Sequence, residues 1–419
     1  MFVRLEELVL ANSGEDEFEE VFKLLVAKLW DECTNKESFR PYEDETKTYT
    51  AIAKLLGEAE KAWQGIVEPF AAPALTPEHL QVCVEALSRH KILGSSFEVM
   101  DSFFEFIVAK SAKGSKGQYF TPRYVVEFCV RMLKPQVNET LLDPACGSGG
   151  FLVHALNYVR QRQSLTKAKA AEYSSTKLWG FDIDGRAIRV AKALMVLAGD
   201  GRANIIRLNS LVKPGTPQTV LPGLETNGTV LTVEDICRTR LRRHKGFDII
   251  LTNPPFAGEL RERHVLDSYK LAGGKSRVER DILFLERCIE MLRPGGRLAI
   301  VLPHNKVAAE SYADIRQWLV RKARILGVVG LGRHTFLPHT HQKTSIVFAQ
   351  RRKELQPING DEKIFFAVSE RDGKNSKGQL SLRTGIPEGD NLWEGVDHDL
   401  SDIVGAFEEF CRSQEIRLE

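Results

Sequence analysis

The first 115 residues place hydrophobic side chains at helical spacing, three or four positions apart. This spacing puts the apolar positions of each segment on one face of a helix, which must be buried against another element. The apolar faces recognisable in this way are formed by Phe18, Val21, Phe22, Leu25 and Leu29, by Leu80, Val84 and Leu87, and by Phe97, Met100, Phe103, Phe104 and Ile107. Residues 1–115 are therefore predicted to form a helical N-terminal domain, with assembly rather than catalysis as its expected role.

After a small, basic linker at residues 110–118, short apolar runs of β type alternate with helical segments. The predicted strands are residues 140–143, 177–182, 204–208, 247–252, 297–302, 324–330, 343–350 and 363–368, and the predicted helices are residues 150–162, 185–199, 279–293 and 310–322. This alternation predicts an α/β domain whose mostly parallel sheet is covered by helices on both faces. We place this domain at residues 116–370 and treat residues 371–419 as a C-terminal tail.

Two local signals refine this picture. Thr121 and Pro122 predict a helix start, with Thr121 as the N-cap and Pro122 at the first helical position. Residues 213–246 interrupt the alternation of strands and helices with several prolines and glycines. This stretch is predicted to begin as a loop inserted between two core elements.

Composition and charge limit the class of protein. The 419 residues are 43% hydrophobic and 27% charged, which is typical of a soluble globular chain of about two domains. Because the net charge is only +2, any affinity for nucleic acid must come from a local patch or a partner. The chain has no basic, apolar leader and no apolar run near the ~20 residues of a membrane span. Seven scattered cysteines without a C-x-x-C pair argue against disulfides and structural zinc, so we expect a cytoplasmic protein without membrane association.

A strand that ends in an acidic residue is followed by a glycine-rich turn and a helix at residues 141–151. Glycines let the backbone approach a ligand closely, and ligands of open α/β sheets lie at the carboxyl ends of the strands. The first strand ends at Asp143 and the second at Asp182, whose carboxylate can accept both ribose hydroxyls of an adenosine. No Lys-Ser or Lys-Thr follows the glycines, which excludes a P-loop. The alternative is that the two acids only cap adjacent helices.

The strand at residues 247–252 stops abruptly in Asn253-Pro254-Pro255-Phe256. An exocyclic amine conjugated to its ring is a poor nucleophile, and donating both N–H groups to fixed carbonyl oxygens frees its lone pair. The Asn253 side chain and the Pro254 backbone can supply these carbonyls, and the prolines hold the backbone rigid. Phe256 offers a face on which a planar base can stack. The tetrad predicts methylation of a planar amine by in-line displacement, where positioning does most of the work; the alternative is an ordinary Asn-Pro turn.

Together these motifs resemble the modification subunit of type I restriction-modification systems, a family of N6-adenine DNA methyltransferases. Residues 117–123 resemble its first motif, residues 143–150 its glycine-rich motif, and residues 253–256 its catalytic tetrad. The resemblance spans residues 117–350 and implies a Rossmann-like sheet that binds S-adenosyl-L-methionine. It implies cofactor contacts from Gln118, Tyr119, Phe120, Thr121, Pro122, Arg123, Asp143, Ala145, Gly147, Ser148, Gly149, Gly150, Asp182, Ile183 and Asn209, and catalytic roles for Asn253, Pro254, Pro255 and Phe256.

The same resemblance implies partners. A domain that reads several bases typically needs about 100 residues or more, and fewer follow the last predicted core strand. Sequence specificity is therefore expected in a separate specificity subunit, with two modification chains per specificity chain and, in some assemblies, a restriction subunit. Double-stranded DNA is the expected substrate. The N-terminal domain is the expected site of assembly or DNA contact, and residues 371–419 are the expected partner-binding region.

Other interpretations stay open. A protein glutamine-amide N-methyltransferase would use the same Asn-Pro-Pro logic, and cytosine N4 is a less favoured substrate. The rival from another class is a non-catalytic assembly module with a vestigial cofactor pocket. The intact Asn253 and the intact glycines argue against it.

Weaker signals surround the tetrad. The polar loop at residues 333–343 contains three histidines but no fourth ligand at suitable spacing, so no metal is expected and contact with the base or its phosphates is favoured. Five basic residues after the tetrad are candidates for phosphate contacts, although a solvated charged face explains them nearly as well. These are Arg261, Arg263, Lys275, Arg277 and Arg280. Cys146 is interpreted as a packing residue, because no adjacent His or Lys would activate it.

Overall fold

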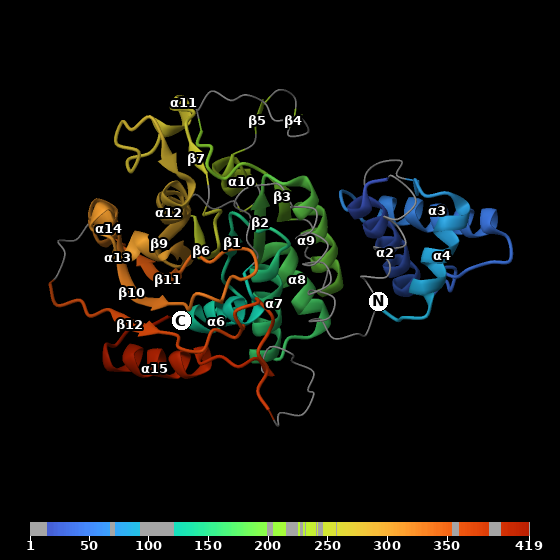
Figure 1. Cartoon of the computed structure of the whole chain (residues 1–419). Helices are drawn as coiled ribbons and strands as arrows, with labels where there is room; N and C mark the ends of the chain where they lie inside the picture. Colours follow the sequence, from blue (N-terminus) through green and yellow to red (C-terminus); the bar gives the residue numbers. More distant parts are fainter. Residues whose placement is uncertain are drawn as a thin grey trace. The chain divides into compact units, whose positions relative to one another are not determined.

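The computed structural model divides the chain into two compact units, residues 1–113 with 192–197 and residues 114–191 with 198–419 (Figure 1). The residues that it describes are 15–67, 72–92, 121–198, 204–214, 225–226, 229–230, 232–239, 241, 246–256, 258–353, 360–384 and 395–418. The third predicted helical face, on Phe97 to Ile107, lies outside them. So do Gln118, Tyr119 and Phe120 of the first predicted cofactor motif.

The N-terminal unit is helical in its described part. Its helices are α2 (Glu17–Thr34), α3 (Glu45–Ala62) and α4 (Pro77–Ser88). The side chains of Asp16, Asp44 and Thr76 cap their N-termini by accepting a backbone N–H. The two described apolar faces are buried as their spacing predicts, with Phe22, Leu25, Leu80 and Leu87 at 0% exposure.

The second unit is built on an eight-stranded sheet of order β12-β10-β11-β9-β6-β1-β2-β3. The strands are β1 (Leu141–Asp143), β2 (Leu178–Asp182), β3 (Ile205–Arg207), β6 (Phe247–Thr252), β9 (Leu292–Pro303), β10 (Ala323–Gly330), β11 (Thr344–Arg351) and β12 (Phe365–Val368). From β3 to β9 all neighbours are parallel, which confirms the mostly parallel sheet. Strand β11 runs antiparallel between β9 and β10. Two short hairpins, β4 (Glu225–Thr226) with β5 (Thr229–Val230) and β7 (Glu259–Leu260) with β8 (Val278–Glu279), lie outside this sheet.

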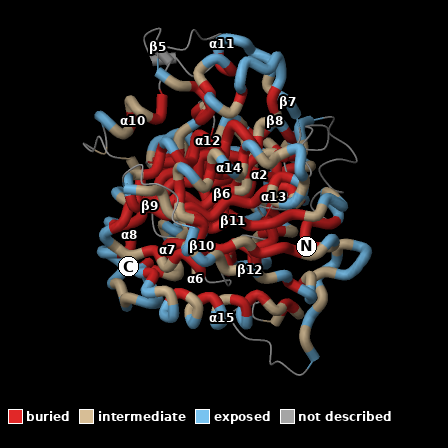
Figure 2. Tube along the Cα trace, turned by 90° about the vertical axis from the view of Figure 1, so that its left-hand side faces the viewer, coloured by how far each residue is buried: buried red, intermediate tan, exposed pale blue. Residues whose placement is uncertain are grey.

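Helices cover both faces of this sheet, as the alternation of elements predicts. They are α6 (Arg123–Leu133), α7 (Gly150–Arg162), α8 (Lys167–Lys177), α9 (Gly185–Ala198), α10 (Val233–Thr239), α11 (Arg263–Leu266), α12 (Arg280–Met291), α13 (His304–Ala308), α14 (Ala313–Lys322) and α15 (Leu400–Ser413). Helices α6, α7 and α15 lie on one face and α12 and α14 on the other, with the buried strands between them (Figures 1 and 2). No helix in the described part of the chain is long and apolar enough to cross a membrane.

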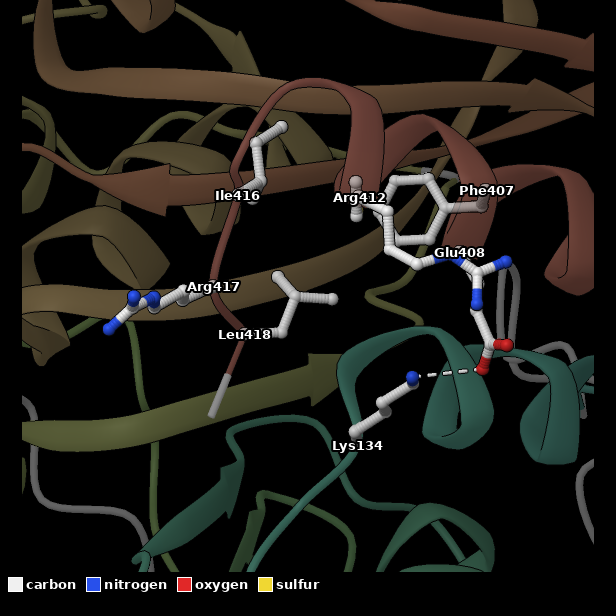
Figure 3. A pocket seen from close by; sticks show the side chains of 8 residues that line it. Lys134, Phe407, Glu408, Arg412, Ile416, Arg417 and Leu418 are labelled. Atoms are coloured by element: carbon white, nitrogen blue, oxygen red, sulfur yellow. Dashed lines mark ion pairs between the residues drawn. The ribbon is translucent and has the colours of Figure 1, made fainter.

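Helix α15 lies in a region where the sequence predicted no element, and it packs on α6. Phe407 lies 5.4 Å from the Phe365 ring of β12 and 6.2 Å from the Phe348 ring of β11. Lys134, after α6, forms a 2.9 Å ion pair with Glu408 (Figure 3). A cavity of about 300 Å³ opens beside this pair. The cavity is lined by residues of α15, the segment after it and Lys134, and none of them is a predicted site residue.

Candidate active site

The strand order brings three predicted site residues to one edge of the sheet. Strand β1 lies between β6 and β2 and is parallel to both. Asp143 and Asp182 are the last residues of β1 and β2, and Asn253 directly follows β6. The carboxyl ends of three neighbouring parallel strands therefore carry two carboxyl groups and one amide, in the position where open α/β sheets bind ligands.

The glycine-rich turn is held to the end of β2 by its own backbone. The N–H of Cys146 donates to the carbonyl of Phe181, and the N–H of Gly147 donates to Oδ2 of Asp182, each over 2.9 Å. Gly147 and Gly149 have φ values of +51° and +86°, in the left-handed region that favours glycine. The turn thus depends on glycines for its backbone conformation.

Gly150 has a different reason to lack a side chain. A Cβ there would lie 1.6 Å from Nη1 of Arg123, which is buried and whose Nη2 donates to the Ser148 hydroxyl over 3.3 Å. A buried guanidinium therefore occupies the space beside the first turn of α7. This contact joins the start of α6 to the glycine-rich turn, and cofactor contacts of Arg123 and Gly150 stay a prediction.

Burial perturbs both carboxyl groups of the site. Asp143 is 1% exposed, and burial raises its pKa to about 7, although the Ala145 N–H donates to it over 3.1 Å. Burial also raises the pKa of Asp182, against the opposing effect of N–H groups from Asp184 and Gly147. A ligand that brings hydrogen-bond donors or positive charge to these oxygens would restore their ionised form. Perturbed carboxyl groups of this kind are typical of ligand sites.

The capping alternative for Asp182 is not what the geometry shows. The side chain of Asp184, not that of Asp182, accepts the backbone N–H groups of Arg186 and Ala187 at the start of α9. Asp182 instead bridges the end of β2 and the glycine-rich turn. Ile183 beside it is 45% exposed, an unusual surface position for a large apolar side chain.

The residues present fit a nucleoside-type cofactor. A Cβ on Gly147 would meet no protein atom within 4 Å, so protein packing does not require glycine there. The adjacent Asp182 carboxylate, which is partly exposed, can accept two ribose hydroxyls, and an exposed apolar side chain can cover a flat adenine ring. Asp182, Ile183 and Gly147 together offer these features at one strand end.

Asn253 is fixed by a contact that corrects one prediction. Helix α6 begins at Arg123 with Pro122 as its N-cap residue and without a side-chain cap, so Thr121 is not the N-cap. The Thr121 hydroxyl instead accepts a 2.8 Å hydrogen bond from Nδ2 of Asn253. This bond directs Nδ2 of Asn253 toward Thr121, so Oδ1 of the same amide points away from Thr121. Thr121 therefore binds the side chain of Asn253, which is distant in the sequence, and does not cap α6.

Phe256 packs against a loop that follows β10. Its ring lies 5.9 Å from the Phe336 ring at an interplanar angle of 71°, an edge-to-face arrangement. Phe256 is 8% exposed and Phe336 1% exposed. The predicted base-contacting loop thus does reach the tetrad, but through Phe336 rather than through its histidines. Phe336 therefore packs against the same Phe256 ring on which the sequence predicts that a base stacks.

The histidines of the same loop form no metal site in the described structure. His334 lies 3.1 Å from the carboxylate of Asp372, and burial lowers the pKa of His339. Across the described ranges no group of three or more His, Cys, Asp and Glu side chains is placed to hold a metal ion.

The segment after β3 is anchored by a residue that the sequence did not single out. Asn209 accepts the Leu211 N–H over 3.1 Å with its own side chain, while Ser210 donates to the carbonyl of Pro144 over 2.7 Å. The Ser210 carbonyl accepts from the buried Arg287, which also binds both oxygens of Glu234. Ser210 therefore ties this segment to the glycine-rich turn, whereas a cofactor contact of Asn209 stays a prediction.

Other predicted residues have local partners. Arg261 and Arg277 pair with Glu259, and Arg263 pairs with Asp267. Phosphate contacts from this basic group therefore stay a prediction. Cys146 is buried, and burial raises the pKa of its thiol well above the ordinary value, as expected for a packing residue.

Comparison with known proteins places this geometry in a family. The family model described as N-6 DNA Methylase matches residues 92–386, which is more than half of the chain. The chain belongs to the N-6 DNA methylase family. The matched range of this N-6 DNA methylase includes the glycine-rich turn, both acidic strand ends, the tetrad and the Phe336 loop.

Curated relatives of this chain include methylase subunits of type I restriction enzymes. The chain is 28% identical over 263 residues to the EcoEI methylase subunit of Escherichia coli, covering 62% of this chain and 47% of that protein. It is 24% identical over 345 residues to the EcoKI methylase subunit of Escherichia coli K12, covering 78% and 59%. The chain spans about half the length of these relatives.

Solved structures confirm the fold. The type I restriction-modification system methyltransferase subunit from Streptococcus thermophilus has a TM-score of 0.59, covers 97% of this chain and 92% of its own, and is 16% identical. A chain from a type I R-M system solved for its complex assembly has a TM-score of 0.57 over 90% of this chain and 76% of its own, at 18% identity. The predicted Rossmann-like methyltransferase sheet with a helical N-terminal region is therefore confirmed.

Proposed function

We propose that this N-6 DNA methylase transfers a methyl group from S-adenosyl-L-methionine to the N6 amino group of adenine in double-stranded DNA. The observation that carries the proposal is the Asn253 amide, held by Thr121 at the end of β6 beside the acidic ends of β1 and β2. Family membership and the names of the curated relatives support the choice of DNA adenine over other planar amines.

Cofactor binding is proposed for the turn and the two neighbouring strand ends. Asp182 accepts the ribose hydroxyls, Ile183 covers the adenine ring, and the turn at residues 147–150 lies against the rest of the molecule. Thr121, Pro122 and Arg123 are proposed cofactor contacts at the start of α6. Gln118, Tyr119 and Phe120 are proposed as further contacts from the sequence. Asp143, Ala145 and Asn209 complete the set of proposed contacts. When bound, the cofactor supplies an electrophilic methyl group on a sulfonium.

Target binding is proposed for the tetrad. The adenine flips out of the duplex at a cost of a few kcal/mol and stacks on Phe256. Its two N–H groups donate to Oδ1 of Asn253 and to the Pro254 carbonyl, while Pro255 fixes the turn. With both N–H groups held, the nitrogen lone pair would be free to take the methyl carbon of a bound cofactor as its carbon–sulfur bond breaks. The surplus proton leaves the nitrogen after transfer, so no strong general base is required.

The chain is proposed to act as the modification subunit of a type I restriction-modification complex. The curated relatives are named as methylase subunits of such enzymes, which supports a separate specificity subunit that selects the DNA sequence. We propose two modification chains per specificity chain and, in some assemblies, a restriction subunit. The N-terminal domain at residues 1–115 and the region at residues 371–419 are the proposed contacts with DNA and partners, and cytoplasm is the proposed location.

The test uses the chain purified with the specificity subunit encoded beside it. The complex receives duplex DNA and methyl-labelled S-adenosyl-L-methionine, and the DNA is digested to nucleosides and separated. Label should appear in N6-methyladenine and be lost in Asn253→Ala. The Asn253→Ala complex should still bind S-adenosylhomocysteine in a calorimeter, which separates loss of chemistry from loss of the cofactor site.

The competing functions give different products in the same assay. Label in protein glutamine would support a protein methyltransferase, and label in N4-methylcytosine would change the target base. A complex that assembles but transfers no label, and does not bind S-adenosylhomocysteine, would support a non-catalytic module and overturn the proposal.

A further inference from the structure

The Phe336 loop is held from outside by a segment that follows β12. This loop comprises residues 331–343, between β10 and β11. The segment that holds it comprises residues 369–384, and Asp372 accepts a hydrogen bond from the loop. It lies after the last core strand, where the sequence carried no recognised motif.

Asp372 binds the start of the loop in two ways. Its Oδ2 accepts the backbone N–H of His334 and lies 3.1 Å from that nitrogen and from Nδ1 of the same imidazole. Its carboxyl group also fills the space beside Gly332, where a Cβ would lie 1.2 Å from Oδ1. The carboxylate therefore needs both the His334 backbone and the missing side chain at Gly332 to reach this position.

The backbone of Asp372 is fixed from the opposite side by α6. The Tyr124 hydroxyl donates to the Asp372 carbonyl over 2.6 Å. Gly373 has a φ of +71°, and a Cβ there would lie 2.7 Å from the Tyr124 ring. The Tyr124 ring also stacks on His398 at 5.3 Å and 16°. Asp372 is thus clamped between a rigid aromatic pair and the loop.

The same segment grips the far side of Phe336. Nζ of Lys374 donates to the Leu337 carbonyl over 2.8 Å. A Cβ on Gly378 would lie 2.7 Å from the backbone nitrogen of Pro338, so these two backbones are in close contact. Contacts at Gly332 and His334 on one side and at Leu337 and Pro338 on the other leave Phe336 between two fixed points.

We propose that Asp372 is a positioning residue for the target base. It touches neither base nor cofactor, and it acts by setting where the Phe336 loop stands relative to Phe256. Because a base on Phe256 must fit beside Phe336, a displaced loop changes the space left for that base without changing the tetrad. This inference rests on the proposed function, since the base is a flipped adenine.

The test uses the assembled complex and a recognised duplex with 2-aminopurine at the target adenine. Fluorescence of this base rises when it leaves the stack. Asp372→Ala should lower the flipped fraction and raise the KM for DNA by about tenfold, the effect expected for losing a buried charged hydrogen bond. The affinity for S-adenosylhomocysteine should stay within about twofold, because the contacts of the glycine-rich turn do not include Asp372.

Two further variants separate positioning from simple loss of stability. Gly332→Ala keeps the carboxylate but pushes it out of place, so it should reproduce the Asp372→Ala phenotype. Asp372→Asn can still accept the His334 N–H and should restore most of the flipping. Glu172→Ala removes an exposed carboxylate on α8, outside the regions proposed to contact DNA, cofactor or partners, and it should behave as the wild type.

The outcomes are distinguishable. If the wild-type complex neither flips the base nor methylates DNA, the proposed function fails and Asp372 has no such role. If the wild type works and both Asp372→Ala and Gly332→Ala flip the base normally, the positioning role is wrong. It is equally wrong if these variants lose S-adenosylhomocysteine affinity as much as flipping, because Asp372 would then support the whole unit.

Discussion

The proposed site has two parts that are held in place differently. One is the cofactor edge, which comprises the glycine-rich turn and the ends of β1 and β2, and the other is the Phe336 loop. At the cofactor edge, the backbone N–H groups of Cys146 and Gly147 bind the end of β2, through the Phe181 carbonyl and the Asp182 carboxylate. The Phe336 loop is held by side chains from distant segments, Tyr124, Asp372 and Lys374. The first contacts join the ends of two adjacent strands, 35 positions apart for Gly147 and Asp182, whereas the second join segments as far apart as the 248 positions between Tyr124 and Asp372.

This difference predicts that the two parts can be damaged separately. Variants at the glycine-rich turn should lower the affinity for the cofactor and leave base flipping nearly unchanged. Variants around the Phe336 loop should do the opposite. Sites without shared partners usually contribute additively, so any strong cross-effect would show that the two parts are coupled.

The largest effect is expected for Gly150→Ala. The new Cβ would lie 1.6 Å from Nη1 of Arg123, a side chain that is 3% exposed and has little room to move. Overpacking of this kind costs about 1–3 kcal/mol, so the affinity for S-adenosylhomocysteine should fall by roughly 100-fold, as measured by calorimetry. The flipped fraction of 2-aminopurine should change little.

Gly147→Ala is the matched control for that variant. Its Cβ would meet no protein atom within 4 Å, so the cost to the folded protein is the left-handed backbone alone, about 1 kcal/mol. Cofactor affinity should still fall if the ligand lies against this turn. An unchanged affinity in Gly147→Ala would mean that the cofactor binds elsewhere.

The next largest effect is expected for Thr121→Val, which keeps the shape of the side chain and removes its hydroxyl. Nδ2 of Asn253 then loses its 2.8 Å acceptor, and the amide is free to turn. The kcat for methyl transfer should fall about tenfold, while Thr121→Ser should restore it. A fall in cofactor affinity with an unchanged kcat would mean that Thr121 acts on the cofactor and not through the Asn253 amide.

These contacts also explain what the sequence could and could not predict. Asp143, Asp182 and Asn253 were predictable because each ends a buried strand, and parallel strands bring such ends together. The role of Thr121 was not, since capping is a local preference and Asn253 lies 132 positions away. Tyr124 and Asp372 are 248 positions apart, and no spacing rule connects them. Ser210 was missed for the same reason, because its partner is a backbone carbonyl in another segment.

A smaller effect is expected for Asp143→Asn, measured as thermal stability without cofactor. The pKa of Asp143 is raised to about 7 in the folded protein. The folded chain therefore holds a proton that the unfolded chain has already released. The stability linked to this proton is complete below the ordinary pKa of aspartate and is lost as pH rises through about 7.

Asn cannot ionise and still accepts the Ala145 N–H, so the substitution removes this penalty. The Tm of Asp143→Asn should exceed that of the wild type by a few degrees more at pH 8 than at pH 5. Equal differences at both pH values would show that Asp143 ionises normally in the folded protein. The flipped fraction should be unchanged, since this residue belongs to the cofactor edge.

The smallest effect is expected for Tyr124→Phe, which offers the sharpest test of separability. The ring and its stacking on His398 remain, and only the hydroxyl that donates to the Asp372 carbonyl is lost. The flipped fraction should fall by about threefold, as for one neutral hydrogen bond. Tyr124 directly follows Arg123, which contacts the glycine-rich turn, so this is where the two parts come closest in the chain. If cofactor affinity falls as much as flipping, α6 transmits the change to both parts, and they are not held independently.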